Sequence, residues 1–162
     1  MRYRLLIAAA LLTTVLVASG CGSTSTSASK PLTRSELVAK VEPICARINT
    51  KISYYSNLTP SNSKDLVSKS AIASAAPQIS SVERNAVAEM EKLTPPSALA
   101  NDWKQIVDGV KTVSEDTMKV GEDVKIENRT LAASVMASAE TALQQMRAAA
   151  ARDGLAQCEK VI

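Results

Sequence analysis

Residues 97–126, SALANDWKQIVDGVKTVSEDTMKVGEDVKI, decide the fold of this chain. Mostly apolar side chains recur in this stretch at alternating spacings of three and four residues: Trp103, Ile106, Val110, Val113, Thr117, Val120 and Val124. A 3.5-residue repeat forms one seam along a helix and is typical of helices that pack nearly parallel in a bundle. Gly109 and Gly121 flank the seam, and they either permit close approach of a neighbouring helix or weaken this one.

Three further segments show the three-to-four-residue spacing of apolar side chains that predicts amphipathic helices. The first covers residues 33–57 and opens with a capping box, Thr33 followed by Glu36 three positions later. Pro43 lies inside it and predicts a kink. The second follows a turn at residues 58–63, and Pro77 either kinks it or separates two helices.

Prolines and a glycine mark where the later helices end. Thr94-Pro95-Pro96 ends the second helical segment, because a residue before proline is pushed out of helical geometry. A break at residues 127–129 precedes the fourth helix, which runs to about Arg152 with Gly154 as its stop. Residues 155–162 are then a short tail. Short connections predict an all-α, up-down-up-down four-helix bundle with kinked helices, in which the first and fourth helices are antiparallel neighbours.

The N-terminus carries an export signal. Arg2 and Arg4 precede an apolar run at residues 5–17, which suits a signal peptide and is too short to span a membrane. Ala18-Ser19-Gly20-Cys21 follows and resembles the lipobox of bacterial lipoproteins, with Ala18 where that pattern prefers leucine. The alternative is an ordinary signal peptide followed by a chance cysteine.

This resemblance predicts three parts and a location. Residues 1–20 are a lipoprotein signal peptide, residues 21–32 are a flexible Ser/Thr-rich tether, and residues 33–162 are the helical domain. A diacylglyceryl group, of the palmitate type, on Cys21 supplies at least two acyl chains, which suffice for stable anchoring. The tether spans roughly 15–20 Å as a random coil. The domain is therefore expected on the extracytoplasmic face of the cell membrane, with the membrane as its first partner.

Two cysteines remain beyond Cys21, namely Cys45 and Cys158. An even pair in an exported protein predicts a disulfide. This bond would clip the bundle by closing a loop of more than 100 residues, which corresponds to about 4.7 kcal/mol in the loop-entropy model. Two separately buried thiols are the alternative.

The composition excludes several classes of function. Without residues 1–20 the chain has 142 residues with 17 Lys and Arg against 16 Asp and Glu, so it offers no support for nucleic-acid binding. It contains no His, which removes the usual general base and the commonest metal ligand. The acidic residues between 115 and 127 fit a solvated, salt-bridged helix face better than a calcium site. We therefore expect no catalytic residues, no metal and no cofactor.

A ligand site is harder to exclude. Tyr54 and Tyr55 lie near the predicted end of the first helix, and the two proline kinks could splay one end of the bundle into a cleft beside them. The alternative function is therefore a carrier of a lipid or small apolar ligand.

Three short motifs resemble a family of small, uncharacterised lipoproteins and secreted helical proteins of high-GC Gram-positive (actinobacterial) bacteria. They are Ile44-Cys45 in the first helix, Leu93-Thr94-Pro95-Pro96 in mid-chain and Gly154-Leu155-Ala156-Gln157-Cys158 near residue 158. Pro43 directly before Ile44 departs from the family pattern. The resemblance implies a disulfide-clipped helical domain and brings no known activity. The expected function is a non-enzymatic, membrane-anchored module that binds an envelope protein or has a structural role, with the carrier as the alternative.

Overall fold

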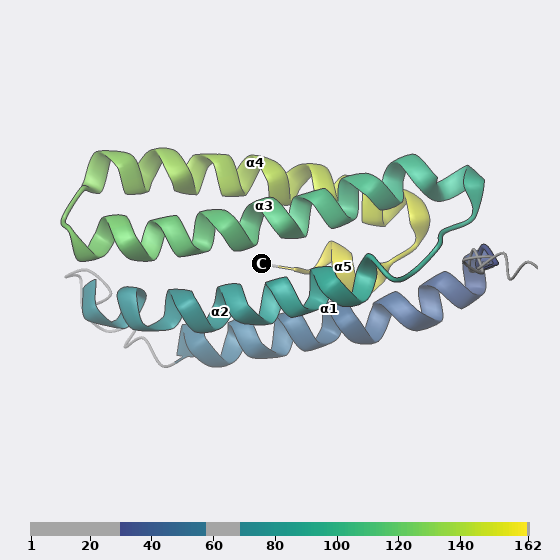
Figure 1. The fold of residues 1–162 in the computed structure, drawn as a ribbon, viewed down its shortest axis with the longest axis horizontal. Helices are drawn as coiled ribbons and strands as arrows, with labels where there is room; N and C mark the ends of the chain where they lie inside the picture. Colours follow the sequence, from purple (N-terminus) through teal and green to yellow (C-terminus); the bar gives the residue numbers. More distant parts are fainter. Residues whose placement is uncertain (1–29, 58–68, 162) are drawn as a thin grey trace, which may run out of the picture.

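A computed structural model describes residues 30–57 and 69–161. Within them the long helices are α1 (Arg34–Asn57), α2 (Lys69–Met90), α3 (Ala100–Lys125) and α4 (Arg129–Asp153). A short 3₁₀ turn, η1 (Ser97–Leu99), leads into α3, and a four-residue helix, α5 (Ala156–Glu159), follows α4. The four long helices run up, down, up and down, as Figure 1 shows, which confirms the predicted all-α bundle. The predicted signal peptide and Cys21 lie outside the described residues.

The start of α1 and the end of α4 form where the sequence predicts them, whereas α2 already ends at Met90, before Thr94-Pro95-Pro96. At the start of α1, Thr33 N–H donates to the Glu36 carboxylate at 2.7 Å, and Glu36 N–H donates to Thr33 Oγ1 at 3.3 Å, so the capping box is closed. The Asn128 side chain accepts a hydrogen bond from Leu131 N–H at the start of α4. Gly154 ends α4 with a φ of 72°, a conformation that glycine adopts without a side-chain clash.

Both prolines lie inside helices that continue beyond them. Pro43 lies within α1 and Pro77 within α2, so α2 is one helix rather than two. Proline has no N–H for the carbonyl four residues earlier. Both proline rings are exposed, which places the interruption on the side of each helix where water can satisfy the freed carbonyl.

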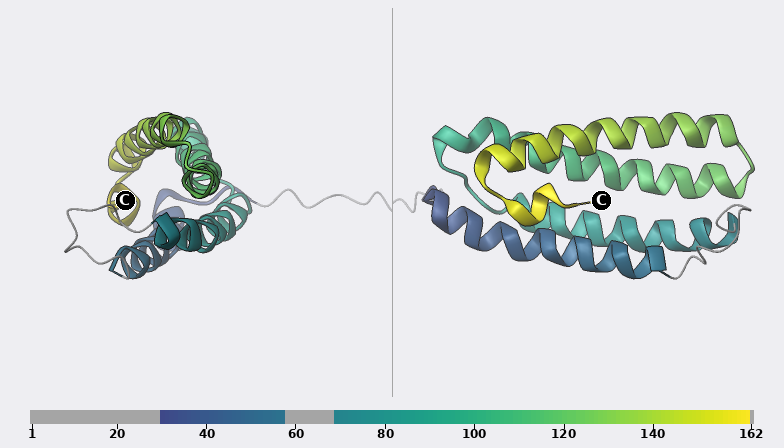
Figure 2. Two further views of the ribbon diagram at one scale, coloured as in Figure 1. Left: turned by 90° about the vertical axis from the view of Figure 1, so that its left-hand side faces the viewer. Right: turned by 180° about the vertical axis from the view of Figure 1, so that it is seen from behind.

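The helices form two layers, with α1 and α2 in one and α3 and α4 in the other (Figure 1). The most extensive interfaces join α3 to α4 and α2 to α3. As expected, α1 and α4 are neighbours where α1 begins and α4 ends, with Arg34 donating to the Arg152 carbonyl, and α5 packs against both helices. Figure 2 shows the chain turning back after α4 so that α5 lies between the layers. In the described part of the chain, residues 155–161 therefore fill the space between α1 and α4.

The core confirms the seam of α3 and corrects the register of α2. The first four seam residues, Trp103 to Val113, are buried, and the later ones are half-buried. On α2 the buried positions between residues 76 and 90 are Ala76, Ser80, Glu83, Ala86, Val87 and Met90. The apolar spacing of Ala75, Ile79 and Val82 predicts a stripe one position earlier, about 100° away around the helix. The difference arises because two of the observed core positions are polar.

The two glycines of α3 lie at close helix crossings. A Cβ on Gly109 would come within 2.7 Å of Met146 Cβ on α4, and one on Gly121 would come within 2.5 Å of Ala76 Cβ on α2. Separations this short do not occur between real carbon atoms in contact. Of the two roles considered for these glycines, close approach of a neighbouring helix is the one observed.

We expect Gly121→Ala to lower the free energy of unfolding by about 1–3 kcal/mol through overpacking, although Gly→Ala inside an unhindered helix normally raises it by about 1 kcal/mol. Adding Ala76→Gly should recover much of the loss, because it removes the atom that the new methyl group meets. Urea unfolding of the two single variants and the double variant measures this coupling. Gly109→Ala is the matched control, since Ala76→Gly should not rescue it. A stabilised Gly121→Ala variant would contradict the described α2–α3 contact.

Candidate functional site

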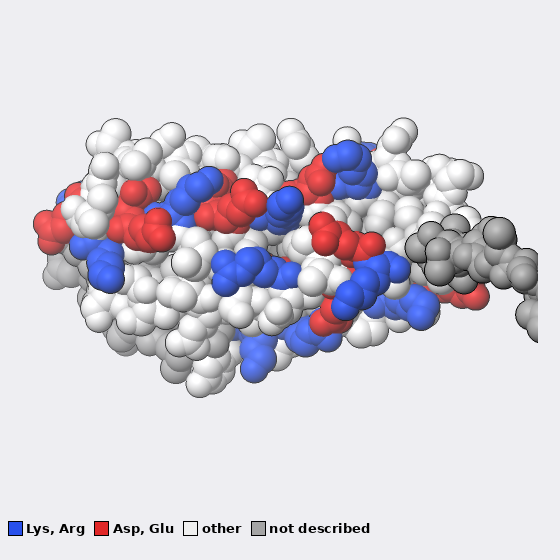
Figure 3. All heavy atoms as spheres, in the orientation of Figure 1, with Lys and Arg blue, Asp and Glu red and all other residues white. Residues whose placement is uncertain are grey.

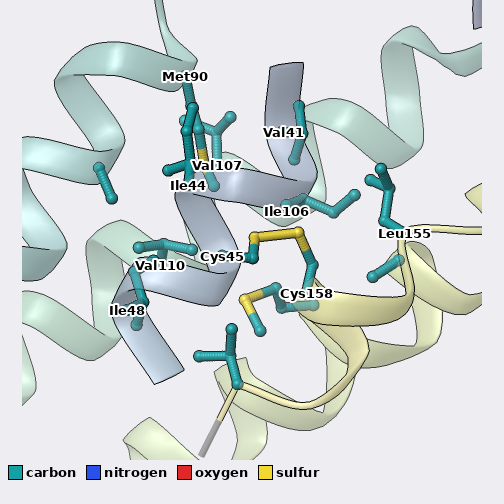
Figure 4. Close-up of a cluster of buried hydrophobic side chains, with 14 of the residues drawn as sticks. Val41, Ile44, Cys45, Ile48, Met90, Ile106, Val107, Val110, Leu155 and Cys158 are labelled. Carbon is teal, nitrogen blue, oxygen red and sulfur yellow. A yellow bond between two sulfur atoms is a disulfide. The ribbon is translucent and has the colours of Figure 1, made fainter. Parts of the chain in front are cut away.

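The predicted pairing of Cys45 and Cys158 is confirmed. Their sulfur atoms are 2.04 Å apart and their Cα atoms 4.9 Å apart, and both residues are 0% exposed. Figure 4 shows the bond inside the apolar core, where it joins α1 to α5 and lies near Ile106 and Leu155. The disulfide is thus part of the core.

Hydrogen bonds attach the segment that contains Cys158 to α1 on one side and to α4 on the other. Gln157 N–H donates to both carboxylate oxygens of Glu42 on α1, at 3.1 Å each, and Asn49 Nδ2 donates to the Gln157 carbonyl at 2.8 Å. On the other side, Arg147 Nε of α4 donates to the Val161 carbonyl at 2.8 Å. Leu155 and Val161 are buried as well. The segment that was predicted to be a short tail is therefore a clamp between α1 and α4, and we call residues 155–161 the clamp segment.

Of the two tyrosines predicted beside a cleft, the structure describes the side chain of Tyr54 alone. Tyr54 lies in the last turns of α1 and is 57% exposed. The side chain of Tyr55 and the lipidation residue Cys21 lie outside the described residues. A depression that the structure does describe lies at the opposite end of α1, beside its first turns.

The acidic residues of α3 lie on two faces, and the expectation of a solvated face holds for only one of them, because Asp116 and Asp123 are buried. Asp108, Glu115 and Glu122 are exposed, and Asp108 pairs with Lys104 one turn away. Figure 3 shows charges of both signs interleaved along the band where α3 lies. Within residues 30–57 and 69–161, no three or more Cys, Asp or Glu side chains are grouped so that they could hold a metal ion.

A buried polar cluster lies between α2 and α3. Ser80 Oγ and Ser114 Oγ are 3.0 Å apart, and Ser114 Oγ is also 3.0 Å from the Ser80 carbonyl, to which it donates. Arg84 Nη1 donates to Ser80 Oγ at 3.0 Å. Glu83, which hydrogen-bonds to Thr117, lies in the same interface. We call these residues the Glu83 cluster.

Glu83 is the single acid of this cluster as defined above. It is 2% exposed, and its Oε2 has no hydrogen-bond partner among the described residues. Burial raises the pKa of Glu83 to about 7, and the Thr117 hydrogen bond and the Arg84 charge offset only part of this effect. A lone carboxyl with this pKa can take up and release a proton near neutrality. The sequence pattern missed it because a charged residue is normally taken as a solvent-facing position.

A second buried carboxyl lies where α1 begins and α4 ends. Asp153, the last residue of α4, is 2% exposed, and its Oδ2 has no hydrogen-bond partner within the described part of the chain. Burial raises the pKa of Asp153, and the neighbouring Asp102 charge raises it further, while Arg34 and Arg152 act in the opposite direction.

Asp153 lines a shallow surface depression. The residues around it come from the first turns of α1 and the end of α4: Thr33, Arg34, Ser35, Val38, Ala39, Asp153 and Gly154. Arg34 Nη2 donates to the Arg152 carbonyl at 3.3 Å. Arg152 itself forms a two-pronged ion pair with Asp102, with distances of 2.5 and 3.2 Å. We call this the Asp153 depression.

None of the helices in the described ranges has an apolar window long enough to cross a bilayer. Comparisons with protein-family models, with curated proteins and with solved structures gave no match.

Proposed function

We propose that this chain is an exported lipoprotein whose helical bundle is held on the extracytoplasmic face of the cell membrane by a lipid on Cys21. The bundle acts there as a non-enzymatic module that binds another component of the envelope. One observation carries the proposal, the buried Cys45–Cys158 disulfide. Stable structural disulfides occur mainly in oxidising compartments outside the cytosol.

The sequence before the bundle supports the same location. The basic start, the short apolar run and the Ala18-Ser19-Gly20-Cys21 motif make up a lipoprotein signal. Lys30 is the first described residue and lies beside the start of α1, only nine positions after Cys21. A coil of this length spans roughly 15–20 Å, so the end of the bundle that contains the Asp153 depression would lie close to the membrane.

The arrangement of polar groups supports a non-enzymatic role. In the described residues Glu83 and Asp153 lie in different interfaces, one between α2 and α3 and one at the junction of α1 and α4. General acid–base chemistry on a substrate uses groups that converge on one reacting atom. These two carboxyls do not converge.

Mass spectra of the protein extracted from its own membrane test the proposal. The denatured, non-reduced protein should begin at Cys21, carry the mass of a diacylglyceryl group, and gain two hydrogens on reduction of Cys45–Cys158. A Cys21→Ala variant should be released into the soluble fraction, whereas a Cys45→Ala/Cys158→Ala variant should remain in the membrane. An unmodified Cys21 thiol in the membrane-extracted protein would refute the lipid anchor.

One observation favours a second candidate, a carrier of a lipid or small apolar ligand. The Asp153 depression has the apolar walls of Val38 and Ala39 around a buried carboxyl with an unpartnered oxygen. A native mass spectrum tests this function. Extra mass that disappears on denaturation supports the carrier, and its absence at saturating lipid argues against it.

A further inference from the structure

We propose that two copies of this chain pair through an exposed face of α4, with the two α4 helices antiparallel. The face consists of Arg129, Ala133, Met136, Ala137 and Glu140, and we call it the α4 face. This self-association goes beyond the proposed function and does not depend on the lipid anchor.

The α4 face points away from the core of the bundle. Helix α4 lies along the outer edge of its layer (Figure 1), and its extensive contacts within the described residues are with α3 and α5. All five residues of the face are exposed, and Met136 is 59% exposed. At 3.6 residues per turn they fall within an arc of about 100° around the helix. They therefore form one continuous strip that a second helix could cover.

The middle of the α4 face is uncharged. No Lys, Arg, Asp or Glu occurs between residues 130 and 139, and Figure 3 shows mostly uncharged surface along the part of α4 nearest its start. A solvent-facing side of a helix normally carries charged residues. Ala133 and Ala137 are small enough for a second helix to approach to about 8 Å between axes, and Met136 adapts to the surface it meets. The centre of the face thus suits contact with another helix.

One base and one acid flank this uncharged centre. Arg129 and Glu140 are about 16 Å apart along α4, too far to pair with each other. Neither forms an ion pair with another residue of the ranges that the structure describes. Consider an antiparallel pair whose two-fold axis is level with residues 134 and 135. Arg129 of each copy then lies opposite Glu140 of the other, and Met136 lies opposite Ala133.

This charge complementarity favours a second copy as the occupant. A two-fold contact forms each ion pair twice, and charges flanking an apolar contact set the direction and register of two helices. A parallel pair in register would instead place Arg129 beside Arg129 and Glu140 beside Glu140, and like charges repel. The face covers only about three turns, so the dimer is expected to be weak and transient.

Sedimentation of the mature chain with Cys21→Ser tests the self-association. The weight-average mass should rise toward that of a dimer as the concentration increases to about 1 mM, a range in which weak complexes are populated. A chain that stays monomeric over this range would overturn the proposal. Assembly beyond the dimer would also overturn it, because a closed two-fold contact ends at two copies. This chain has no lipid, so neither result bears on the anchor.

Exchanging the two charges tests which residues meet. Arg129→Glu should weaken dimerisation at least tenfold, because each copy then presents two acids to the other. Glu140→Arg should do the same with two bases. An equimolar mixture of these two single variants should dimerise again, since one carries acids where the other carries bases. Unchanged dimerisation of either variant alone, or a mixture that stays monomeric, would refute the antiparallel pairing.

A pair of matched variants tests the apolar centre. Met136→Gln should weaken dimerisation, whereas Leu131→Gln should not, although Leu131 is also exposed, at 48%. Leu131 lies about 140° from Met136 around α4, outside the α4 face. Urea midpoints of both variants, measured at low concentration, should match that of the parent because both side chains are exposed. Full dimerisation of Met136→Gln, or loss of dimerisation in Leu131→Gln at an unchanged midpoint, would refute the assigned face.

Discussion

Removing the Cys45–Cys158 disulfide is expected to lower the free energy of unfolding by about 2–5 kcal/mol, with about 4.7 kcal/mol as the loop-entropy value for a loop of about 100 residues. The two cysteines are 113 positions apart, so the bond restricts nearly the whole domain in its unfolded state. In the folded state the bond also keeps the clamp segment between α1 and α4. A loss of this size would remove a large share of the stability of a typical small domain.

Urea unfolding of the oxidised chain and of the Cys45→Ala/Cys158→Ala variant measures this effect. A strong reductant added to the oxidised chain should shift its unfolding midpoint toward that of the variant and leave the variant unchanged. Cys21→Ser is the matched control, since Cys21 has no part in the described disulfide. If the double variant unfolded at the same urea concentration as the oxidised chain, the clamp segment would not be held by the disulfide.

Stability is expected to fall as the pH rises through the range in which Glu83 titrates. The carboxyl has a pKa of 4.5 when unfolded and about 7 when folded. Between these values the folded state binds more protons than the unfolded state, so a rising pH favours unfolding. At about 1.4 kcal/mol per pKa unit, Glu83 alone lowers the free energy of unfolding by about 3 kcal/mol between pH 4.5 and pH 8. The raised pKa of Asp153 acts in the same direction.

Glu36 and Asp102 act in the opposite sense at lower pH. The Thr33 hydrogen bonds lower the pKa of Glu36, and the Arg152 hydrogen bond lowers that of Asp102. The stability that these two carboxylates contribute is lost as the pH falls through their folded pKa values. The chain should therefore be most stable at mildly acidic pH.

Glu83→Gln tests the assignment, because the amide has a similar shape and no charge. Urea midpoints at pH 5, 6, 7 and 8 should fall steadily for the parent chain and stay much flatter for this variant. The variant should be the more stable chain at pH 8. Glu91→Gln, at an exposed position just after α2, serves as the control and should follow the parent. A parental slope in Glu83→Gln would assign the pH dependence to other groups.

The helices and their packing could be predicted where the local sequence pattern and the core require the same residues. The seam of α3 needs apolar side chains at a 3.5-residue spacing, and Trp103, Ile106 and Val110 supply them and are buried. Helix ends that depend on neighbouring residues alone, such as Thr33 with Glu36 and the stop at Gly154, could be placed from the sequence. The disulfide could be predicted because the N-terminal motif predicts export and the two cysteines beyond Cys21 have one pairing available.

The candidate sites could not be predicted because they contradict the pattern that reveals the fold. Ser80 and Glu83 occupy core positions of α2 that a hydrophobic stripe leaves blank, and they are stabilised by partners on α3 that only the folded chain brings near. Asp153 and Arg34 are far apart in sequence and meet only because α4 ends beside the start of α1. The clamp segment is too short to show a helical period, so its place between α1 and α4 was missed.

The position of the clamp segment also sets the order in which this domain can be completed. A polypeptide is synthesised from its N-terminus, and α1 to α4 precede the residues that fill the space between α1 and α4. Leu155, Cys158 and Val161 are all buried there, so the core remains unfinished until residue 161 has emerged. Premature termination before Cys158 would thus leave a chain with four helices, an unpaired thiol at Cys45 and an exposed apolar surface, the kind of species that aggregates.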